Sequence, residues 1–207
     1  MTVQAVIFDI GNVLTEWQPE AFYDRTIGPL RRKALFDAVD LHKMNLDIDA
    51  GALFRETIYD WADRHPDWRP EIRWWYDRWI ELASPRIEGS IALLRALRTK
   101  AVPVFALTNF GKYSFDEALP KLDFLAEFDR LYVSGRMGVV KPDPRIYAMV
   151  EADCAIPPGQ LLFVDDKPEN IAAAAVRGWQ THLFTHWQLW AARLVDERLL
   201  TRSEAGL

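Results

Sequence analysis

The chain has 207 residues, half of them hydrophobic, which suits one globular domain with an insertion, or one large and one small unit. Its formal net charge is −5 and it contains no lysine- and arginine-rich run, which argues against a nucleic-acid partner. No apolar run approaches the roughly 20 residues that a membrane-spanning helix needs, and the single cysteine, Cys154, excludes an internal disulfide. We therefore expect a cytoplasmic protein with neither nucleic acid nor membrane as a partner.

Five short apolar segments are predicted to be strands. They begin at Val3, Val102, Arg130, Gln160 and Thr181. Their apolarity is continuous, which is typical of strands that are covered on both faces in a parallel sheet. The first carries Asp9 where the apolar region of a signal peptide would continue, so we interpret it as a strand.

Helical patterns alternate with these strands and predict an α/β sandwich. The segment 88–100 places Ile91, Leu94 and Leu97 on one face. A second helix is expected to begin after Asp143 as its N-cap. The charged tail after about Leu194 is predicted to be a fraying helix.

Residues 15–87 interrupt this alternation, because they contain no convincing strand. The segment holds six of the nine tryptophans, and the run that includes Ile72, Trp75, Trp79 and Leu82 has helical spacing. We expect these aromatic side chains to pack inward rather than to form a partner surface. The sequence thus predicts two domains, a core of residues 1–14 and 88–207 and a helical cap of residues 15–87.

Polar residues follow the predicted strands at the edge of the sheet where ligands bind in parallel α/β folds. They are Asp9 with Gly11 after the first strand, Thr108 with Asn109 after the second, Lys141 before a helix, and Asp165 with Asp166 after a later strand. Adjacent carboxylates repel one another, by about 1 kcal/mol at 4 Å in water and several times more near a protein surface. A hard cation such as Mg²⁺ removes this penalty.

The order of these motifs resembles the haloacid dehalogenase (HAD) superfamily of hydrolases over nearly the whole chain. "FDIGNVL", "LTN", "KPDPRIY" and "FVDDKPENI" are similar to its four motifs, and "FDIGNV" is most similar to a branch that includes a sugar-phosphate phosphatase. The resemblance implies a Rossmann-like three-layer α/β/α core with a parallel sheet and an inserted all-helical cap. It also implies a cytoplasmic Mg²⁺-dependent phosphatase, monomeric or homodimeric, that acts on a small phosphorylated metabolite.

The resemblance implies that Asp9 attacks phosphorus and forms an aspartyl-phosphate. Thr108 would hold a phosphoryl oxygen together with Asn109 and the backbone amides of Ile10 and Gly11. Lys141 would steady both Asp9 and the phosphoryl group.

The metal site implied by the resemblance lies beside this nucleophile. Asp166, Asp9 and the carbonyl of Gly11 would bind Mg²⁺ directly, Asp165 would act through a water molecule, and Asn170 would support the carboxylates.

The chain departs from most phosphatases of this superfamily at Gly11, where they carry a second aspartate that protonates the leaving group and then activates water. Such acid–base help is typically worth 10²–10⁴-fold in rate. A phosphatase would then need a substrate with a good leaving group. Hydrolysis of its intermediate would still need a group that activates water, for which Glu16 and His42 are candidates.

Two alternatives stay open. A 2-haloacid dehalogenase releases halide without a proton, and the spacing of Lys141 and Tyr147 is seen in such enzymes. That chemistry needs no metal, however, so the repulsion between Asp165 and Asp166 would remain without a cation to relieve it. A non-catalytic module would bind a phosphorylated ligand, or would bind a protein through the cap. For the latter, Trp74 is the candidate, because it falls off the helical stripe of the other aromatic residues.

Overall fold

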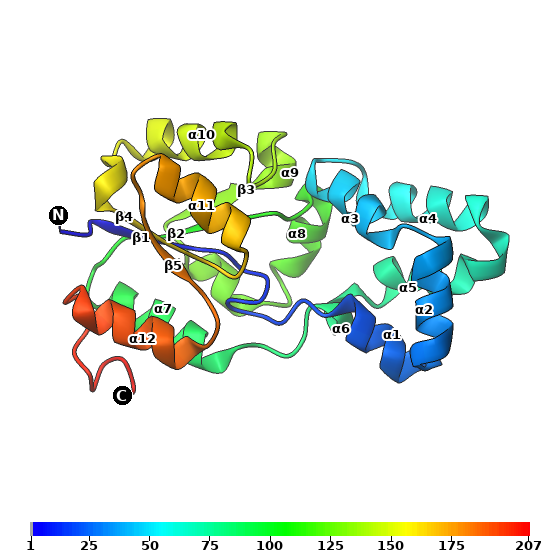
Figure 1. Ribbon diagram of the computed structural model, residues 1–207, viewed down its shortest axis with the longest axis horizontal. Helices are drawn as coiled ribbons and strands as arrows, with labels where there is room; N and C mark the ends of the chain where they lie inside the picture. The colour runs from blue at the N-terminus through cyan, green and yellow to red at the C-terminus, as the bar shows by residue number, and fades with distance from the viewer. Residues whose placement is uncertain (1) are drawn as a thin grey trace.

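The computed structural model describes residues 2–207 and is built around a five-stranded parallel sheet with strand order β3-β2-β1-β4-β5 (Figure 1). The strands are β1 Ala5–Phe8, β2 Val104–Thr108, β3 Arg130–Val133, β4 Leu161–Asp165 and β5 Gln180–Leu183. Phe8 of the central strand β1 is in register with Ala106 of β2 and Val164 of β4. All five predicted strands are confirmed, and the ends of β1, β2 and β4 lie next to one another.

Helices connect the strands and fill the segment between β1 and β2. They are α1 Pro19–Ile27, α2 Pro29–Ala38, α3 Leu41–Asp49, α4 Phe54–Arg64, α5 Arg69–Asp77, α6 Trp79–Leu82, α7 Glu88–Thr99, α8 Lys112–Ala118, α9 Ser134–Met137, α10 Pro144–Cys154, α11 Pro168–Val176 and α12 Trp187–Asp196. Within residues 2–207, none of these helices has the length and apolarity to cross a membrane.

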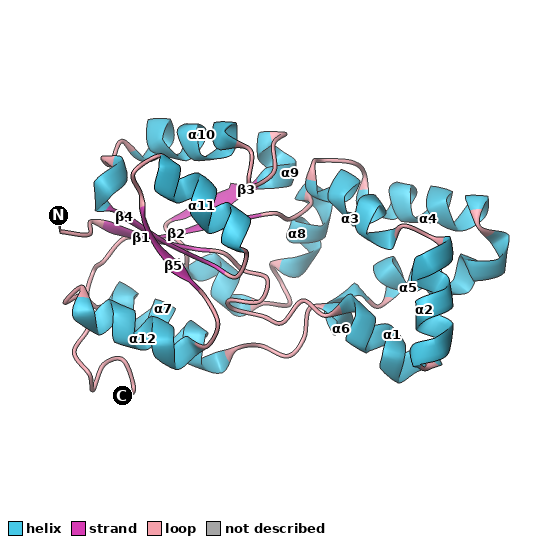
Figure 2. Ribbon diagram, in the orientation of Figure 1, coloured by secondary structure: helices cyan, strands magenta, loops and turns pink. Residues whose placement is uncertain are grey.

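Alternate residues of each central strand enter two different apolar layers. Ile7 of β1 packs in the layer that contains Ile146 of α10, whereas Phe8 packs in the layer that contains Leu94 of α7 and Trp190 of α12. Figure 2 shows α10 and α11 on one side of the sheet and α7 and α12 on the other. This arrangement explains the unbroken apolarity of the strand sequences and confirms the three-layer α/β/α core.

Helices α1–α6, which we call the cap helices, gather at one end of the molecule (Figure 1). The six tryptophans of residues 15–87 are all buried or half-buried. Trp74 stacks on Tyr23 with ring centroids 6.4 Å apart, so it packs within the cap helices and is not exposed. The division into two domains at residues 14 and 88 stays a prediction.

Two local expectations differ from the structure. The predicted helical run around Trp75 is broken at Arg78, whose φ of −129° ends α5, although Trp75 and Trp79 are both buried as expected. The expected fraying helix after Leu194 is wrong, because α12 ends at Asp196 and the tail turns so that Leu199 and Leu200 are buried. Burial of these leucines outweighs continued helix in a tail whose other residues are largely polar.

Candidate active site

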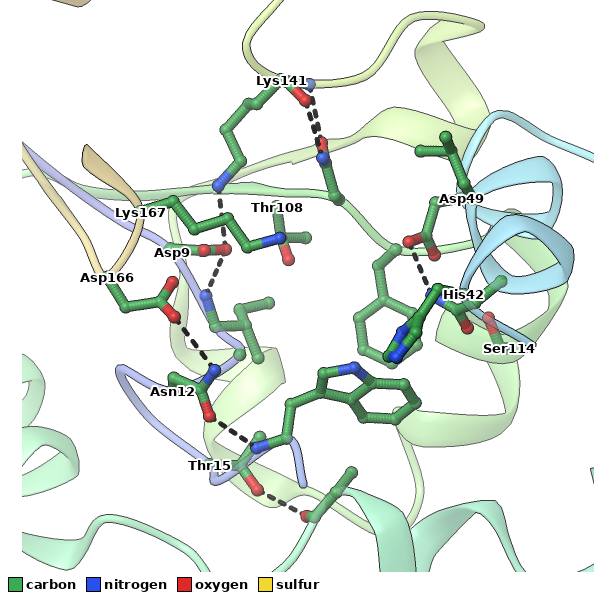
Figure 3. Close-up of a pocket in the computed structure, with 18 of the residues that line it drawn as sticks. Asp9, Asn12, Thr15, His42, Asp49, Thr108, Ser114, Lys141, Asp166 and Lys167 are labelled. Carbon is green, nitrogen blue, oxygen red and sulfur yellow. Dashed lines mark hydrogen bonds and ion pairs between the residues drawn. The ribbon is translucent and has the colours of Figure 1, made fainter. Parts of the chain in front are cut away.

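A cavity of about 310 Å³ lies where the carboxyl ends of β1, β2 and β4 face the cap helices (Figure 3). Eight of the nine predicted site residues line it: Asp9, Ile10, Gly11, Thr108, Asn109, Lys141, Asp166 and Asn170. The ninth, Asp165, is fully buried behind them. Segments far apart in the sequence therefore meet at one site because the strands that carry them are parallel neighbours.

Asp9 presents one held and one unpaired carboxylate oxygen. Its Oδ1 accepts a hydrogen bond from the backbone N–H of Ile10 at 2.7 Å and lies 3.0 Å from Lys141 Nζ. Its Oδ2 has no hydrogen-bond partner among residues 2–207, so it is available for attack. Burial raises the pKa of Asp9 to about 7; the nearby charge of Lys141 opposes this rise, and Asp165 and Asp166 add to it. A further cation would return this group to the carboxylate form.

Lys141 is a fully buried cation held between two carboxylates. Its Nζ donates to Asp165 Oδ2 at 2.6 Å and to the carbonyl of Leu107 at 2.8 Å, and it also lies beside Asp9. Burial alone would lower the pKa of Lys141, but Asp9 and Asp165 outweigh it and the pKa is raised. The lysine is therefore charged and cannot turn away from Asp9.

Asn109 fixes the backbone of Lys141. The Asn109 side chain donates from Nδ2 to the Lys141 carbonyl at 2.9 Å, and its Oδ1 accepts from the Lys141 N–H at 2.7 Å. Both ends of the Asn109 amide are thus used by the Lys141 loop, so the structure indicates a positioning role for this side chain. The phosphate contact predicted for Asn109 stays a prediction.

Asp165 is held by neighbouring donors. Besides Lys141, it accepts hydrogen bonds from the Lys167 N–H at 2.8 Å and from Asn170 Nδ2 at 2.9 and 3.0 Å. A carboxylate with this many donors anchors Lys141 and Asn170. The support predicted for Asn170 corresponds to these two contacts.

The carboxylates of Asp9, Asp165 and Asp166 approach one another closely, each offering an oxygen within 4.8 Å of the others. Asp166 is less buried and accepts from Asn12 Nδ2 at 3.0 Å. Near them, Asn170 Oδ1 is buried and has no hydrogen-bond partner among the described residues. An oxygen-only donor set with an unpaired acceptor beside it fits Mg²⁺ and its water shell.

Two donors face the cavity from the core. Thr108 is 2% exposed, and its hydroxyl has no hydrogen-bond partner among residues 2–207. Lys167 points into the same cavity (Figure 3), and its charge acts on both Asp166 and Asp49. These groups can bind the oxygens of an anion.

Steric crowding does not require a glycine at position 11. A Cβ atom built on Gly11 would meet only the Trp17 Cβ, at an ordinary contact distance of 3.7 Å. The position therefore has room for a Cβ atom, and crowding at this point does not account for the glycine.

The candidates for activating water, Glu16 and His42, and the dehalogenase candidate Tyr147 are not directed at the nucleophile Asp9. Glu16 lines a neighbouring hollow and not this cavity. His42 is at the cavity edge, exposed, and 2.9 Å from Glu20. Tyr147 is fully buried behind the site, where its hydroxyl donates to the carbonyl of Asn170.

Asn12, Asp49 and Lys167 are among the lining residues that carry no role in the sequence interpretation. Asn12 could have been found, because an asparagine after the strand end is one of the few residues that tolerate its φ of 55°. Nothing in the local sequence marks Asp49, one of two aspartates on α3. Only the docking of α3 on the core brings it to the cavity.

The family model described as haloacid dehalogenase-like hydrolase matches residues 3–178. A drimenol cyclase of Aspergillus calidoustus is 27% identical over 187 residues, a match that takes in 88% of this chain but only 34% of the cyclase. The chain thus spans about a third of that protein's length.

Two phosphatases match over most of their lengths. The sesquiterpene phosphatase of Aspergillus oryzae is 25% identical, covering 86% of this chain and 87% of the relative. The D-ribitol-5-phosphate phosphatase of Bacteroides thetaiotaomicron is 22% identical, covering 86% and 90%.

Solved structures share the fold. A HAD-family enzyme of Bacteroides thetaiotaomicron superposes with a TM-score of 0.74 at 18% identity, covering 94% of this chain and 99% of that chain. The same enzyme in complex with magnesium and inorganic phosphate gives 0.67, covering 88% and 94% at 18% identity. The L-2-haloacid dehalogenase of Xanthobacter autotrophicus with chloropropionic acid covalently bound gives 0.61 at 17% identity, covering 99% and 87%.

Proposed function

The chain belongs to the haloacid dehalogenase-like hydrolase family, and from this premise we propose that it is a Mg²⁺-dependent phosphatase. Its substrates would be small phosphate monoesters, hydrolysed through an aspartyl-phosphate on Asp9. The cavity of about 310 Å³ fits a metabolite of the size of a sugar phosphate. The two phosphatases that match over most of their lengths support this reaction class.

The charge of the site carries the proposal. Three carboxylates lie within 4.8 Å of one another, and the buried cation at their centre is Lys141, so the four groups leave two uncompensated negative charges when ionised. Each like-charged pair at about 4 Å costs on the order of 1–4 kcal/mol. A haloacid, itself an anion, would worsen this repulsion. Mg²⁺ bound by Asp9, Asp166 and the Gly11 carbonyl would neutralise the cluster and attract a phosphate dianion.

The residues of the chain then have distinct roles. Oδ2 of Asp9 attacks phosphorus while Oδ1 is held by Ile10 and Lys141. The unpaired hydroxyl of Thr108 and the backbone N–H of Gly11 donate to the phosphoryl oxygens, with the N–H of Ile10 shared with Asp9. Lys141 stabilises the charge that accumulates as the new bond forms.

The cap side of the cavity favours an organic group with an apolar part. It is lined by Phe54, Trp75 and Trp79 of the cap helices, and Trp17 and Phe110 pack against two of these rings. Such a wall binds a carbon skeleton by burial, while the core side binds the phosphate.

Hydrolysis of p-nitrophenyl phosphate tests the proposal directly. We expect phosphate release with Mg²⁺, none above background in EDTA, and a loss of at least about 10³-fold in Asp9→Asn, which keeps the shape but not the nucleophile. A pair of outcomes would contradict it. Metal-independent halide release from 2-chloropropionate would make the protein a dehalogenase, and phosphate binding without turnover in Mg²⁺ would make it a binding module.

A further inference from the structure

In-line displacement fixes where a proton donor must stand. The leaving oxygen departs on the side of phosphorus opposite the attacking Asp9, which here is the side of the cap helices. Gly11 supplies no carboxylate next to the nucleophile, so a donor has to come from the opposite wall. Two titratable side chains of the cap helices line the cavity, His42 and Asp49.

Asp49 lies at the carboxyl end of α3 and points into the cavity across from Asp9, with Thr108 between them in the view of Figure 3. The charges of Asp9 and Lys141 act on the Asp49 carboxyl group, which places it within electrostatic reach of the reacting centre. His42, in contrast, is exposed to solvent and engaged with Glu20.

A chain of contacts fixes the Asp49 side chain. Asn45 Nδ2 donates to Asp49 Oδ2 at 2.9 Å, and Asn45 Oδ1 in turn accepts from Trp75 Nε1 at 3.2 Å. The backbone of the same residue is tied to the core, because Ser134 Oγ donates to the Asp49 carbonyl at 2.6 Å. Both the cap helices and the core therefore define its position.

Glycines allow this close approach of α3 to the core. A Cβ atom on Gly111 would lie 2.5 Å from Ile48 Cγ2 and 2.9 Å from the Ile48 carbonyl, and one on Gly51 would lie 3.1 Å from the carbonyl of Gly135. The contact thus has a glycine at each of these points of closest approach. It holds the neighbour of Ile48, Asp49, at a fixed depth in the cavity.

The surroundings of Asp49 favour its protonated form. Burial of the carboxyl group of the half-buried Asp49 raises its pKa well above its usual range, and Asp9 adds to this rise. Lys167, the Gly111 backbone amide and Lys141 act in the opposite direction. A carboxylic acid that keeps its proton closer to neutral pH is a better general acid than an exposed aspartate.

We propose that Asp49 is the general acid and general base of this enzyme, in place of the carboxylate that Gly11 lacks; the inference rests on the proposed phosphatase reaction. As Asp9 Oδ2 bonds to phosphorus, the bond to the leaving oxygen breaks and Asp49 gives that oxygen its proton. The resulting Asp49 carboxylate then takes a proton from water as the water oxygen attacks phosphorus and the bond to Asp9 breaks. Asp49 ends the cycle protonated and Asp9 as a free carboxylate.

The test compares Asp49→Asn with Asp47→Asn, a matched change on the same helix that alters a carboxylate paired with Lys43 outside the cavity. Two substrates are used with Mg²⁺, a phosphate ester of 2-phenylethanol and 2,4-dinitrophenyl phosphate. The oxygen of 2-phenylethanol needs a proton in order to leave, whereas 2,4-dinitrophenolate leaves without one. Circular dichroism and thermal unfolding establish that both variants are folded.

For Asp49→Asn we expect kcat on the alkyl ester to fall about 10²–10⁴-fold. With 2,4-dinitrophenyl phosphate, transfer of the phosphoryl group to Asp9 still takes place, so dinitrophenolate appears in a burst of about one equivalent per protein. Turnover after the burst is slow, because no base activates the water that hydrolyses the aspartyl-phosphate. Mass spectrometry then finds one phosphoryl group on Asp9. Asp47→Asn behaves like the unaltered protein on both substrates.

Three results would overturn the inference. Near-normal turnover of the alkyl ester by Asp49→Asn removes the need for this acid. Equal loss on both substrates without a burst makes Asp49 a structural or binding residue. In the unaltered protein, a steep dependence of kcat/KM on leaving-group acidity across aryl phosphates would mean that no donor acts there, whatever the variant does. If the unaltered protein and Asp47→Asn release no phosphate from any ester, the proposed function itself fails.

Discussion

Lys141 is the residue on which the charge balance of the site depends. It contacts Asp9 and Asp165 in a region from which water is excluded, with distances of 3.0 and 2.6 Å. A buried ion pair contributes little net stability, but removing one partner leaves the other as an uncompensated charge. Asn109 and the Leu107 carbonyl hold the lysine at this position.

The variant Lys141→Met is expected to destabilise the protein by about 3–5 kcal/mol at pH 8 and by less at pH 5. Without the cation, the folded-state pKa of Asp9, which burial already raises to about 7, rises further. The variant then keeps its stability at low pH, where Asp9 is protonated, and loses it as pH rises through this raised folded-state pKa. Urea unfolding at the two pH values measures the difference. The exposed Lys33→Met is the control, and an equal cost at both pH values would contradict the explanation.

Helix α3 is the element that carries the cap side of the site. Its N-cap Asp40 accepts from the Lys43 N–H, and its other end meets the loop at Gly111 and α9. The apolar residues of α3 bury one face, and the polar Asn45 and Asp49 near its end face the cavity. The helix thus joins the packing of the cap helices to the chemistry of the core.

The variant Gly111→Ala tests this contact. Its new methyl group would press on the side chain and carbonyl of Ile48, so we expect a loss of about 1–3 kcal/mol in the free energy of unfolding. Turnover should fall as well, because the end of α3 moves. Lys112→Ala, at the next position but exposed, is the control for denaturant unfolding and kcat. Unchanged stability together with unchanged kcat would show that the approach of α3 to Gly111 is not needed.

The whole molecule brings three carboxylates together at the junction of the sheet and the cap helices, and a cation would relieve their repulsion. Burial raises the pKa of Asp9 to about 7. A carboxyl group whose pKa is higher in the folded than in the unfolded state stabilises the fold at low pH. The contribution of Asp9 to the free energy of unfolding therefore disappears as pH rises towards 7. Mg²⁺ competes with the proton, so its stabilising effect should grow with pH.

We therefore expect Mg²⁺ at 100 times its dissociation constant to stabilise the protein by about 2.7 kcal/mol, which corresponds to roughly 5–11 °C in Tm for a chain of this size. The same Mg²⁺ concentration should have a smaller effect at pH 5.5. Differential scanning calorimetry with MgCl₂ or EDTA measures the shift, with NaCl at equal ionic strength as control. Asp166→Asn should remove most of it. A shift that is larger at pH 5.5, or that survives in Asp166→Asn, would contradict the metal assignment.

Local patterns in the amino-acid sequence are enough to specify the sheet and the core half of the site. Runs such as the one that ends at Asp9 are apolar at every position because both faces of the strand are covered. Since parallel strands end at one edge, the residues at or just after the strand ends, Thr108 and Asp166 included, can be assigned to one site from their order in the chain.

The contacts that each of these groups makes depend on the tertiary structure. Asn109 holds the Lys141 backbone, Asp165 is enclosed by donors, and Asp49 comes from the cap helices to face Asp9. Asp49 could not be found in the sequence, because its position depends on the close approach of α3 to glycines more than 60 residues away in the chain. Strand periodicity is a short-range property, whereas the docking of one helix on a distant loop depends on side-chain shapes that a local pattern does not encode.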